Sequence, residues 1–417
     1  MHALHPTDSR RARAHAPSSL KILRSETSSA DAAGFIDYDI VIVGGGPVGC
    51  TLALGLAAAR RSVLLLDASP ELHADDPRTV ALSYGSRLIL ERLQVWREIA
   101  PLTAIDTIHI SQRGGFGSTV LTAADAHTPS LGYVAPYAVV QRALKRRVQE
   151  AHSLQMESGA RVTAFAERRD SLLVAFEHRG RETRVGAALT IIADGGALAQ
   201  QSARIEVRDY KQSALIGNVT ASLAHRHTAF ERFTQEGPLA LLPHAGGYAL
   251  VWTVSPERGI ELCSCPDDTF LRQLQEAFGT RAGKFSGVRD RTTFPLALRV
   301  ASDANFDRML LIGNAAQALH PVAGQGLNLG LRDAWELADL LSAVEGDADM
   351  SAVMKSYQRA RQRDRRASVL LTDAMVRAFS NSNLALQWVR GCGLTFLDCV
   401  PAAKHRFMQQ MIFGALW

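Results

Sequence analysis

Near its start the chain reads Ile40-Val41-Ile42-Val43-Gly44-Gly45-Gly46-Pro47-Val48-Gly49. The apolar run predicts a buried strand, the glycines and the proline predict a tight turn, and the Ala- and Leu-rich residues up to Arg60 predict a helix. Gly44, Gly46 and Gly49 have the spacing G-x-G-x-x-G. Residues 40–59 carry no charge and are long enough for a membrane span. Their glycines favour strand, turn and helix instead.

A second apolar run, Val63-Leu64-Leu65-Leu66, follows this helix and ends in Asp67. The whole pattern predicts a dinucleotide-binding βαβ unit, in which the glycines allow the turn, the approach of a pyrophosphate and close helix packing. The helix N-terminus favours phosphate charge. We expect Asp67 to accept hydrogen bonds from ribose hydroxyls. Because its carboxylate would repel a 2′-phosphate, the resident dinucleotide is predicted to be FAD or NAD rather than NADP.

Composition bounds the remaining classes of function. The chain has 417 residues, of which 47% are hydrophobic and 21% charged, which is typical of a globular protein of two or three domains. A net charge of +5, spread along the chain, does not indicate a nucleic-acid partner. The five cysteines are an odd number and favour reduced thiols over a disulfide framework. Cys263 and Cys265 have no second pair at zinc-ligand spacing, so no metal site is predicted.

Residues 1–35 are rich in Ala, Ser and Arg and poor in large apolar side chains, which predicts a disordered extension. Arg10, Arg11 and Arg13, with few acids nearby, also fit an organellar transit peptide, but a bacterial tail is the favoured interpretation. Because no apolar core follows the arginines, the segment is not a secretory signal.

Two later blocks repeat the pairing of a strand with glycines. The first is a strand at residues 189–193 followed by Asp194-Gly195-Gly196. The second is a strand at residues 309–312, then Gly313-Asn314, and a glycine loop that feeds a helix at residues 327–341. The start of that helix is a second candidate anion site, although spacing alone also fits ordinary glycine turns of an α/β core. The loop between them reads His320-Pro321-Val-Ala-Gly324-Gln325-Gly326-Leu327-Asn328.

Together these motifs resemble the FAD-dependent aromatic hydroxylases, the class A flavoprotein monooxygenases. That family is marked by G-x-G-x-x-G, an Asp-Gly element and a Gly-Asp block ending in Pro-x-x-Gly-Gln-Gly-x-Asn, and all three occur here in order. Within it, the chain is most similar to the ubiquinone-biosynthesis hydroxylases, and among these to the 2-polyprenyl-6-methoxyphenol hydroxylases. This narrower likeness rests on Asp76-Pro-Arg-Thr-Val-Ala-Leu-Ser83 and Gly313-Asn-Ala-Ala-Gln-x-x-His320-Pro321.

Two residues depart from the family pattern. Asn314 stands where most class A enzymes have Asp, and an amide can hydrogen-bond but carries no charge. The ubiquinone subfamily tolerates Asn there, so FAD remains the cofactor implied. Asp67 stands where Glu is commoner and keeps the carboxylate.

The resemblance, which covers Tyr38 to Gly414, implies an α/β fold. Its parts are an FAD-binding Rossmann-like domain of the p-hydroxybenzoate hydroxylase type, an inserted antiparallel-sheet substrate domain and a helical C-terminal tail. We expect the FAD domain at 36–106, 132–203 and 290–370, the substrate domain at 107–131 and 204–289, and the tail at 371–417.

The resemblance also implies the reaction. NADH or NADPH reduces FAD, O₂ adds as a C4a-hydroperoxide, and its distal oxygen attacks a polyprenyl phenol in ubiquinone biosynthesis. By the same analogy His320 and Pro321 are the candidate catalytic residues, although His320 fits a core histidine nearly as well, and no general base is evident. The implied cofactor-binding residues are Gly44, Gly46, Gly49, Asp67, Arg78, Asp194, Gly195, Gly313, Asn314, Gly324, Gln325, Gly326, Leu327 and Asn328. For Arg78 a solvated surface position is the alternative.

From Ala374 onward the chain is basic and amphipathic, with Asp398 as its one acid. This predicts a tail that docks on a membrane or on other enzymes of the pathway, or else packs on the protein's own core. The arginines at 359–366 predict a solvated helix face. We therefore expect a cytoplasmic enzyme, peripheral on the inner membrane. The alternatives are a hydroxylase of a soluble aromatic compound, a non-catalytic FAD-holding member of a complex, and a flavin-dependent reductase of isoprenoid chains.

Overall fold

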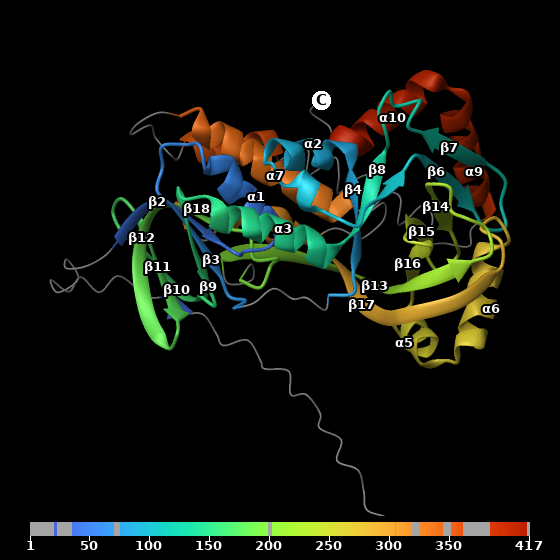
Figure 1. The fold of residues 1–417 in the computed structure, drawn as a ribbon, viewed down its shortest axis with the longest axis horizontal. Helices are drawn as coiled ribbons and strands as arrows, with labels where there is room; N and C mark the ends of the chain where they lie inside the picture. The colour runs from blue at the N-terminus through green and yellow to red at the C-terminus, as the bar shows by residue number, and fades with distance from the viewer. Residues whose placement is uncertain are drawn as a thin grey trace, which may run out of the picture.

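A computed structural model of the chain describes residues 21–22, 36–70, 76–198, 202–304, 306–318, 325–344, 352–361 and 384–414. These residues form two eight-stranded sheets, a three-stranded sheet and helices packed on them (Figure 1). The predicted α/β class is confirmed. The predicted disordered extension lies outside the described residues except for β1 (Lys21–Ile22), which pairs with β10 (Arg161–Glu167) through backbone hydrogen bonds.

The first sheet contains the parallel strands that the glycine motifs follow. β2 (Ile36–Val43) lies between β3 (Val63–Asp67) and β12 (Arg181–Ile192), and all three run parallel. β9 (Leu154–Ser158) extends the sheet beyond β3, and β18 (Met309–Leu311) pairs with the last residues of β12. Because carboxyl ends of parallel strands meet at one edge, the turns after β2, β12 and β18 converge there.

Helices cover one face of this sheet. α1 (Pro47–Leu56), α3 (Tyr137–Glu150) and α7 (Gln325–Ser342) lie over the parallel strands (Figure 1). β10 and β11 (Leu172–His178) continue antiparallel from β12. β2 is buried on both sides, with Ile40 and Ile42 in the helix-facing core and Tyr38, Val41 and Val43 in the opposite core. This explains its continuous apolar run.

The second sheet has the order β19-β17-β13-β16-β15-β14-β6-β7. α5 (Pro256–Ser264) and α6 (Asp267–Phe278) cover one face, where Trp252 and Phe270 are buried. The opposite face looks toward the glycine turns. The strands are β6 (Thr107–Gln112), β7 (Ser118–Thr122), β13 (Ala203–Ala221), β14 (Thr228–Phe233), β15 (Pro238–His244), β16 (Gly247–Val254), β17 (Phe285–Ala304) and β19 (Gln317–Ala318).

A small sheet joins the two large ones. β4 (Thr79–Ser83) and β5 (Thr103–Ile105) both pair antiparallel with β8 (Gly132–Pro136). β4 runs directly into α2 (Tyr84–Arg92), whose first turn is capped by the Ser83 hydroxyl. The short 3-10 helix at Trp96–Glu98 follows α2.

The two C-terminal helices differ in how much of their apolar surface is buried. α10 (Pro401–Phe413) packs on the protein itself, with Met408 and Ile412 buried beside Leu121. α9 (Leu384–Cys399) lies along β7 and β6 and exposes several apolar side chains. No described helix is long and apolar enough to cross a bilayer.

A buried ion pair anchors α7. Arg361, in the helical segment 352–361, pairs with Asp333 of α7, and both side chains are fully buried. Asp333 also accepts a hydrogen bond from the Gly313 amide at 3.3 Å, so the pair supports the turn after β18. The prediction of a solvated face is wrong for Arg361, because a carboxylate from a distant part of the sequence compensates its burial.

Candidate active site

One cavity of about 1750 Å³ runs from the glycine turn after β2 to the inner face of the second sheet. Its lining includes the turns after β2, β12 and β18, the start of α7, and strands β4, β6, β14, β15 and β16. Pockets for one drug-sized ligand are commonly about 300–1,000 Å³. The cavity therefore has room for a dinucleotide and a second molecule side by side.

The glycine turn is shaped by close backbone contacts. A Cβ on Gly49 would lie 1.9 Å from the Gly44 carbonyl oxygen, so α1 reaches the turn only with glycine there. Gly44 has φ of +115°, and a Cβ on it would lie 2.6 Å from the Ala193 carbonyl carbon. A Cβ on Gly46 would meet nothing within 4 Å and would occupy the cavity. Gly46, the N-cap of α1, thus leaves a space that suits a pyrophosphate.

Asp67 lies at the end of β3, where it lines the cavity, and it has a partner that the sequence reasoning missed. Lys145 of α3 forms an ion pair with the Asp67 carboxylate, and both side chains are nearly buried. Asp67 also accepts a hydrogen bond from the Ser69 amide at 3.2 Å. A carboxylate has about four acceptor positions, so ribose hydroxyls can still be accommodated. The pattern of residues around Lys145 predicts a helix, but it does not indicate that Lys145 contacts Asp67.

The Asp194-Gly195 element meets the first glycine turn, as their shared sheet edge requires. Asp194 accepts hydrogen bonds from the amides of Gly196 and Leu198, which close the turn after β12. Burial raises the pKa of Asp194, whereas these amide hydrogen bonds lower it. Gly195 has φ of +75°, and a Cβ there would meet nothing within 4 Å.

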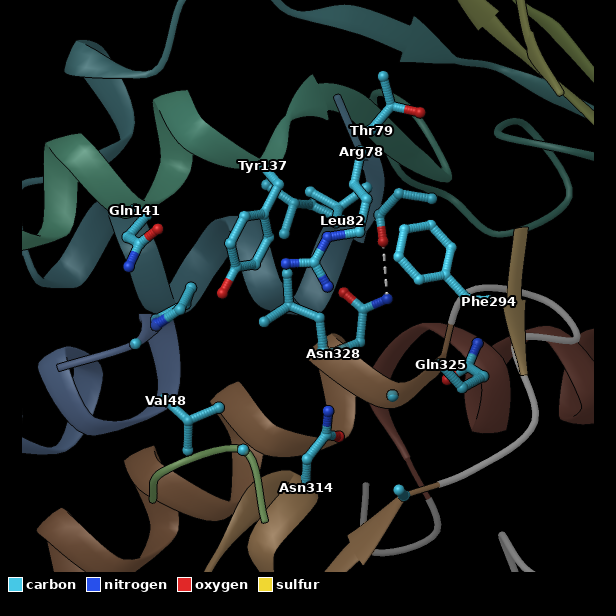
Figure 2. Close-up of a pocket in the computed structure, with 18 of the residues that line it drawn as sticks. Val48, Arg78, Thr79, Leu82, Tyr137, Gln141, Phe294, Asn314, Gln325 and Asn328 are labelled. Carbon is cyan, nitrogen blue, oxygen red and sulfur yellow. Dashed lines mark hydrogen bonds between the residues drawn. The ribbon is translucent and has the colours of Figure 1, made fainter. Parts of the chain in front are cut away.

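Three polar side chains enter the cavity from the α3 side (Figure 2). The Arg78 guanidinium lies 4.4 Å from the centroid of the Tyr137 ring, and its Nε donates to Asp76 at 2.9 Å. The hydrogen bond with Asp76 raises the pKa of Arg78. Gln141 lies one helical turn beyond Tyr137. Arg78 is exposed, and it is also one of the residues that line the cavity.

The turn after β18 and the start of α7 form the opposite wall. Gly313 has φ of +57°, and a Cβ there would lie 3.1 Å from the Val48 side chain of α1. The neighbouring Asn314 points into the cavity (Figure 2). α7 begins at Gln325, two residues earlier than predicted, so Gln325 and Gly326 join Leu327 in its first turn instead of lying in a loop. All three line the cavity.

Asn328 also lines the cavity, but its side chain is used within the protein. Its Oδ1 accepts from the Ser83 amide at 2.8 Å and from the Ser86 hydroxyl at 2.7 Å. Its Nδ2 donates to the Ala81 carbonyl at 2.9 Å, the dashed line of Figure 2. Asn328 therefore ties α7 to β4 and α2. The remaining candidates, His320, Pro321 and Gly324, lie outside the described residues.

The far wall of the cavity is the inner face of the second sheet. Ile110, Ala240, Val251 and Phe294 are among its apolar residues. Glu231 of β14 lies among them, and burial raises its pKa to about 7. The sequence analysis missed Glu231. Side chains alternate along a strand, so an apolar Phe230 in the core beneath the helices was a signal that Glu231 faces the opposite side of the sheet.

Comparison with known proteins decides the family. A family model described as "FAD binding domain" matches residues 37–372. The chain belongs to this FAD-binding family. Ubiquinone hydroxylase UbiL of Rhodospirillum rubrum is 33% identical over 92% of this chain and 90% of its own length. The 3-demethoxyubiquinol 3-hydroxylase of Escherichia coli is 31% identical over 89% of this chain and 97% of its own.

Solved structures agree on the fold of this family. The p-nitrophenol 4-monooxygenase PnpA of Pseudomonas putida superposes with a TM-score of 0.72, at 16% identity, over 91% of this chain and 98% of its own. The predicted fold, with its Rossmann-like FAD domain of the hydroxylase type, is therefore confirmed, as is the resemblance to the FAD-dependent aromatic hydroxylases. FAD is the cofactor, and the space left by Gly46 and the polar groups around the cavity fit it.

Substitutions of Gly46 and Gly49 should distinguish an effect on cofactor binding from an effect on folding. We expect Gly46→Ala to keep the melting temperature of the apoprotein and to lose most of its FAD, because the added methyl occupies the space of the pyrophosphate. Gly49→Ala should instead fail to fold, because its methyl collides with the Gly44 carbonyl. Released flavin per chain and apoprotein melting curves measure both effects. FAD retention by Gly46→Ala equal to the wild type would contradict this reading of the turn.

The two asparagines make a second matched pair. Asn328→Ala leaves Ser83, Ser86 and Ala81 groups without their partner, so we expect unfolding to become easier by about 2–4 kcal/mol. Asn314→Ala should leave the melting temperature of the apoprotein unchanged and weaken FAD binding, while Asn314→Asp should retain it. Denaturant unfolding and FAD titration test the pair. A large loss of apoprotein stability in Asn314→Ala would show that the prediction is wrong.

Proposed function

We propose that this protein is an FAD-dependent monooxygenase that hydroxylates a polyprenyl phenol of ubiquinone biosynthesis, using NADH or NADPH and O₂. One observation carries the proposal, namely that a single cavity joins the FAD-binding turn to an apolar sheet face. The names of the relatives above support the pathway, since two are hydroxylases of ubiquinone or a ubiquinol precursor.

The residues around the cavity have distinct tasks in this proposal. Bound FAD supplies the redox chemistry, accepting reducing equivalents from a nicotinamide and activating O₂. The Gly44–Gly49 turn holds the pyrophosphate and Asp67 a ribose. Gly195, Arg78 and Asn314 would contact FAD, and the amides at the start of α7 would stabilise negative charge on the reduced cofactor. A helix dipole stabilises a charge of this kind by about 0.3–2 kcal/mol. His320, Pro321 and Gly324 keep the roles that the resemblance implies.

The second half of the cavity suits the phenol and its isoprenoid chain. Ile108, Ile110 and Leu121 line it from β6 and β7, and Leu394 and Met408 line it from α9 and α10. Such a lining excludes water from the reacting ring. It also binds a hydrocarbon tail through the hydrophobic effect.

The test is turnover of the holoenzyme with a prenylated phenol and with the same phenol without its chain. We expect NAD(P)H oxidation coupled to incorporation of one oxygen atom from labelled O₂. Burying a five-carbon unit is worth more than about 1.4 kcal/mol, so kcat/KM should rise at least about tenfold per unit. Equal kcat/KM for the two phenols would favour a soluble aromatic substrate. FAD without phenol-stimulated NAD(P)H oxidation would indicate a non-catalytic FAD-holding protein.

We also propose that α9 contacts the membrane in which such a phenol resides. Trp388, Val389 and Phe396 are 65%, 66% and 59% exposed. The Phe116 ring lies 4.8 Å from the Trp388 ring, which extends this α9 surface. Leu394 of the same helix lines the cavity, so α9 lies between the exposed surface and the substrate space. Tryptophan prefers the membrane interface, and exposed Arg406 of the adjoining α10 suits anionic lipid.

The α9 surface can be tested without touching the cavity. We expect Trp388→Ser/Phe396→Ser to abolish co-sedimentation with phosphatidylglycerol vesicles at low salt and to preserve turnover of a short-chain phenol. Ile260→Ser, a 67% exposed residue on α5, is the matched control and should bind vesicles as the wild type does. Unchanged vesicle binding by the double variant would exclude α9 as the contact. Loss of a protein complex instead would point to a partner enzyme.

A further inference from the structure

Glu231 is the one charged residue among the described second-sheet residues that line the cavity. On β14, Phe230 faces the covering helices, where its ring lies 5.4 Å from that of Phe278. Side chains alternate along a strand, so Glu231 faces the cavity on the other side. Its register partners are Ile110 of β6 and Ala240 of β15.

The row of side chains that crosses the sheet at Glu231 is apolar. Val251 follows Ala240 in the same row, and Ile216 of β13 follows Val251. Burial raises the pKa of Glu231 from 4.5 to about 7, and no charged group contributes to the shift. A desolvated carboxyl group of this kind, in a cleft, is a recognised mark of a functional site.

We propose that the Glu231 carboxylate accepts the hydrogen bond, and then the proton, of the substrate's phenol hydroxyl. The O–H bond of the phenol breaks, a new O–H bond forms on a Glu231 carboxylate oxygen, and the electron pair remains on the phenol oxygen. That pair delocalises into the ring and makes its carbon more nucleophilic toward an electrophilic oxygen. The inference rests on the proposed function, which supplies the phenol and the oxidant.

The acid–base match supports this role. A phenol has a pKa near 10, as in tyrosine, and an ordinary glutamate near 4.3, so an exposed carboxylate is a poor base toward it. Desolvation brings the pKa of Glu231 to about 7, near the working pH. A group with such a pKa is an effective general base, and above pH 7 it is largely ionised. The other carboxylates that line the cavity, Asp67, Glu182 and Asp194, come from the first sheet and its turns.

The first experiment compares hydroxylation by Glu231→Gln with that by the wild-type holoenzyme. Glutamine keeps the shape and a hydrogen-bond acceptor but takes up no proton. We expect kcat for hydroxylation to fall about 100-fold, with FAD content unchanged. Glu236→Gln, an exposed residue in the β14–β15 turn, is the matched control. Wild-type kcat in Glu231→Gln, in an enzyme that does hydroxylate the phenol, would overturn the inference and leave the proposed function intact.

The second experiment needs no turnover. Calorimetry without reductant measures Kd for a prenylated phenol and for its methyl ether, across the pH range around the pKa of Glu231. The ionised carboxylate accepts a stronger hydrogen bond than the protonated form, so phenol binding should tighten as the pH rises through about 7. The ether and the Glu231→Gln protein should lack this dependence. The same pH profile for phenol and ether in the wild type would overturn the inference, even if the proposed function failed.

Protein stability gives a check on the environment of Glu231. Folding raises its pKa from 4.5 to about 7, so the folded state binds more protons within that window. The free energy of unfolding therefore falls as the pH rises through the window, and the destabilisation is complete above it. Glu231→Gln should melt higher than the wild type above pH 7 and at the same temperature below pH 4.5. A variant that melts lower at both pH values would overturn the inferred desolvated carboxylate.

Discussion

The structure depends on the close approach of two chain segments that lie about 150 residues apart in sequence. Gly44 can sit against Ala193 and Asp194 only without a side chain, and Gly49 can sit against Gly44 only in the same way. This contact brings the ends of β2 and β12 to one point on the sheet edge. Because α1 begins at that point, its N-terminus faces the space that the FAD pyrophosphate fits.

The remaining walls of the cavity are held in place by contacts outside the glycine turn and the strands beside it. Asn328 fixes the start of α7 against β4 and α2 through three hydrogen bonds. The Asp333–Arg361 pair supports the turn that presents Asn314. The second sheet then closes the cavity on its far side, and α9 and α10 cover its edge. The part of the cavity at the glycine turns and the part at the second sheet are therefore held by different interactions, and variants can affect them separately.

Much of the part of the cavity at the glycine turns could be predicted from the sequence. Local spacing along the chain identifies the glycine turn, Asp67 and the Asp194-Gly195 element, and each of them lines the cavity. The contact of Lys145 with Asp67 could not be predicted, because it depends on how α3 packs near the end of β3. Arg361 looked like part of a solvated basic face for the same reason. Asn328 was found as a residue, but its hydrogen bonds to β4 and α2 depend on packing between distant elements.

Buried charge is treated in two ways in this protein. Lys145 neutralises Asp67, and Arg361 neutralises Asp333, so the folded protein itself supplies the partner of each carboxylate. Burial raises the pKa of Glu231 without any opposing charge. Glu231 is therefore a destabilising group in the cavity wall, because no cation compensates its burial as Lys145 does for Asp67 and Arg361 does for Asp333. The partner that relieves the cost is then expected to arrive with the substrate, as a hydroxyl that can give up its proton.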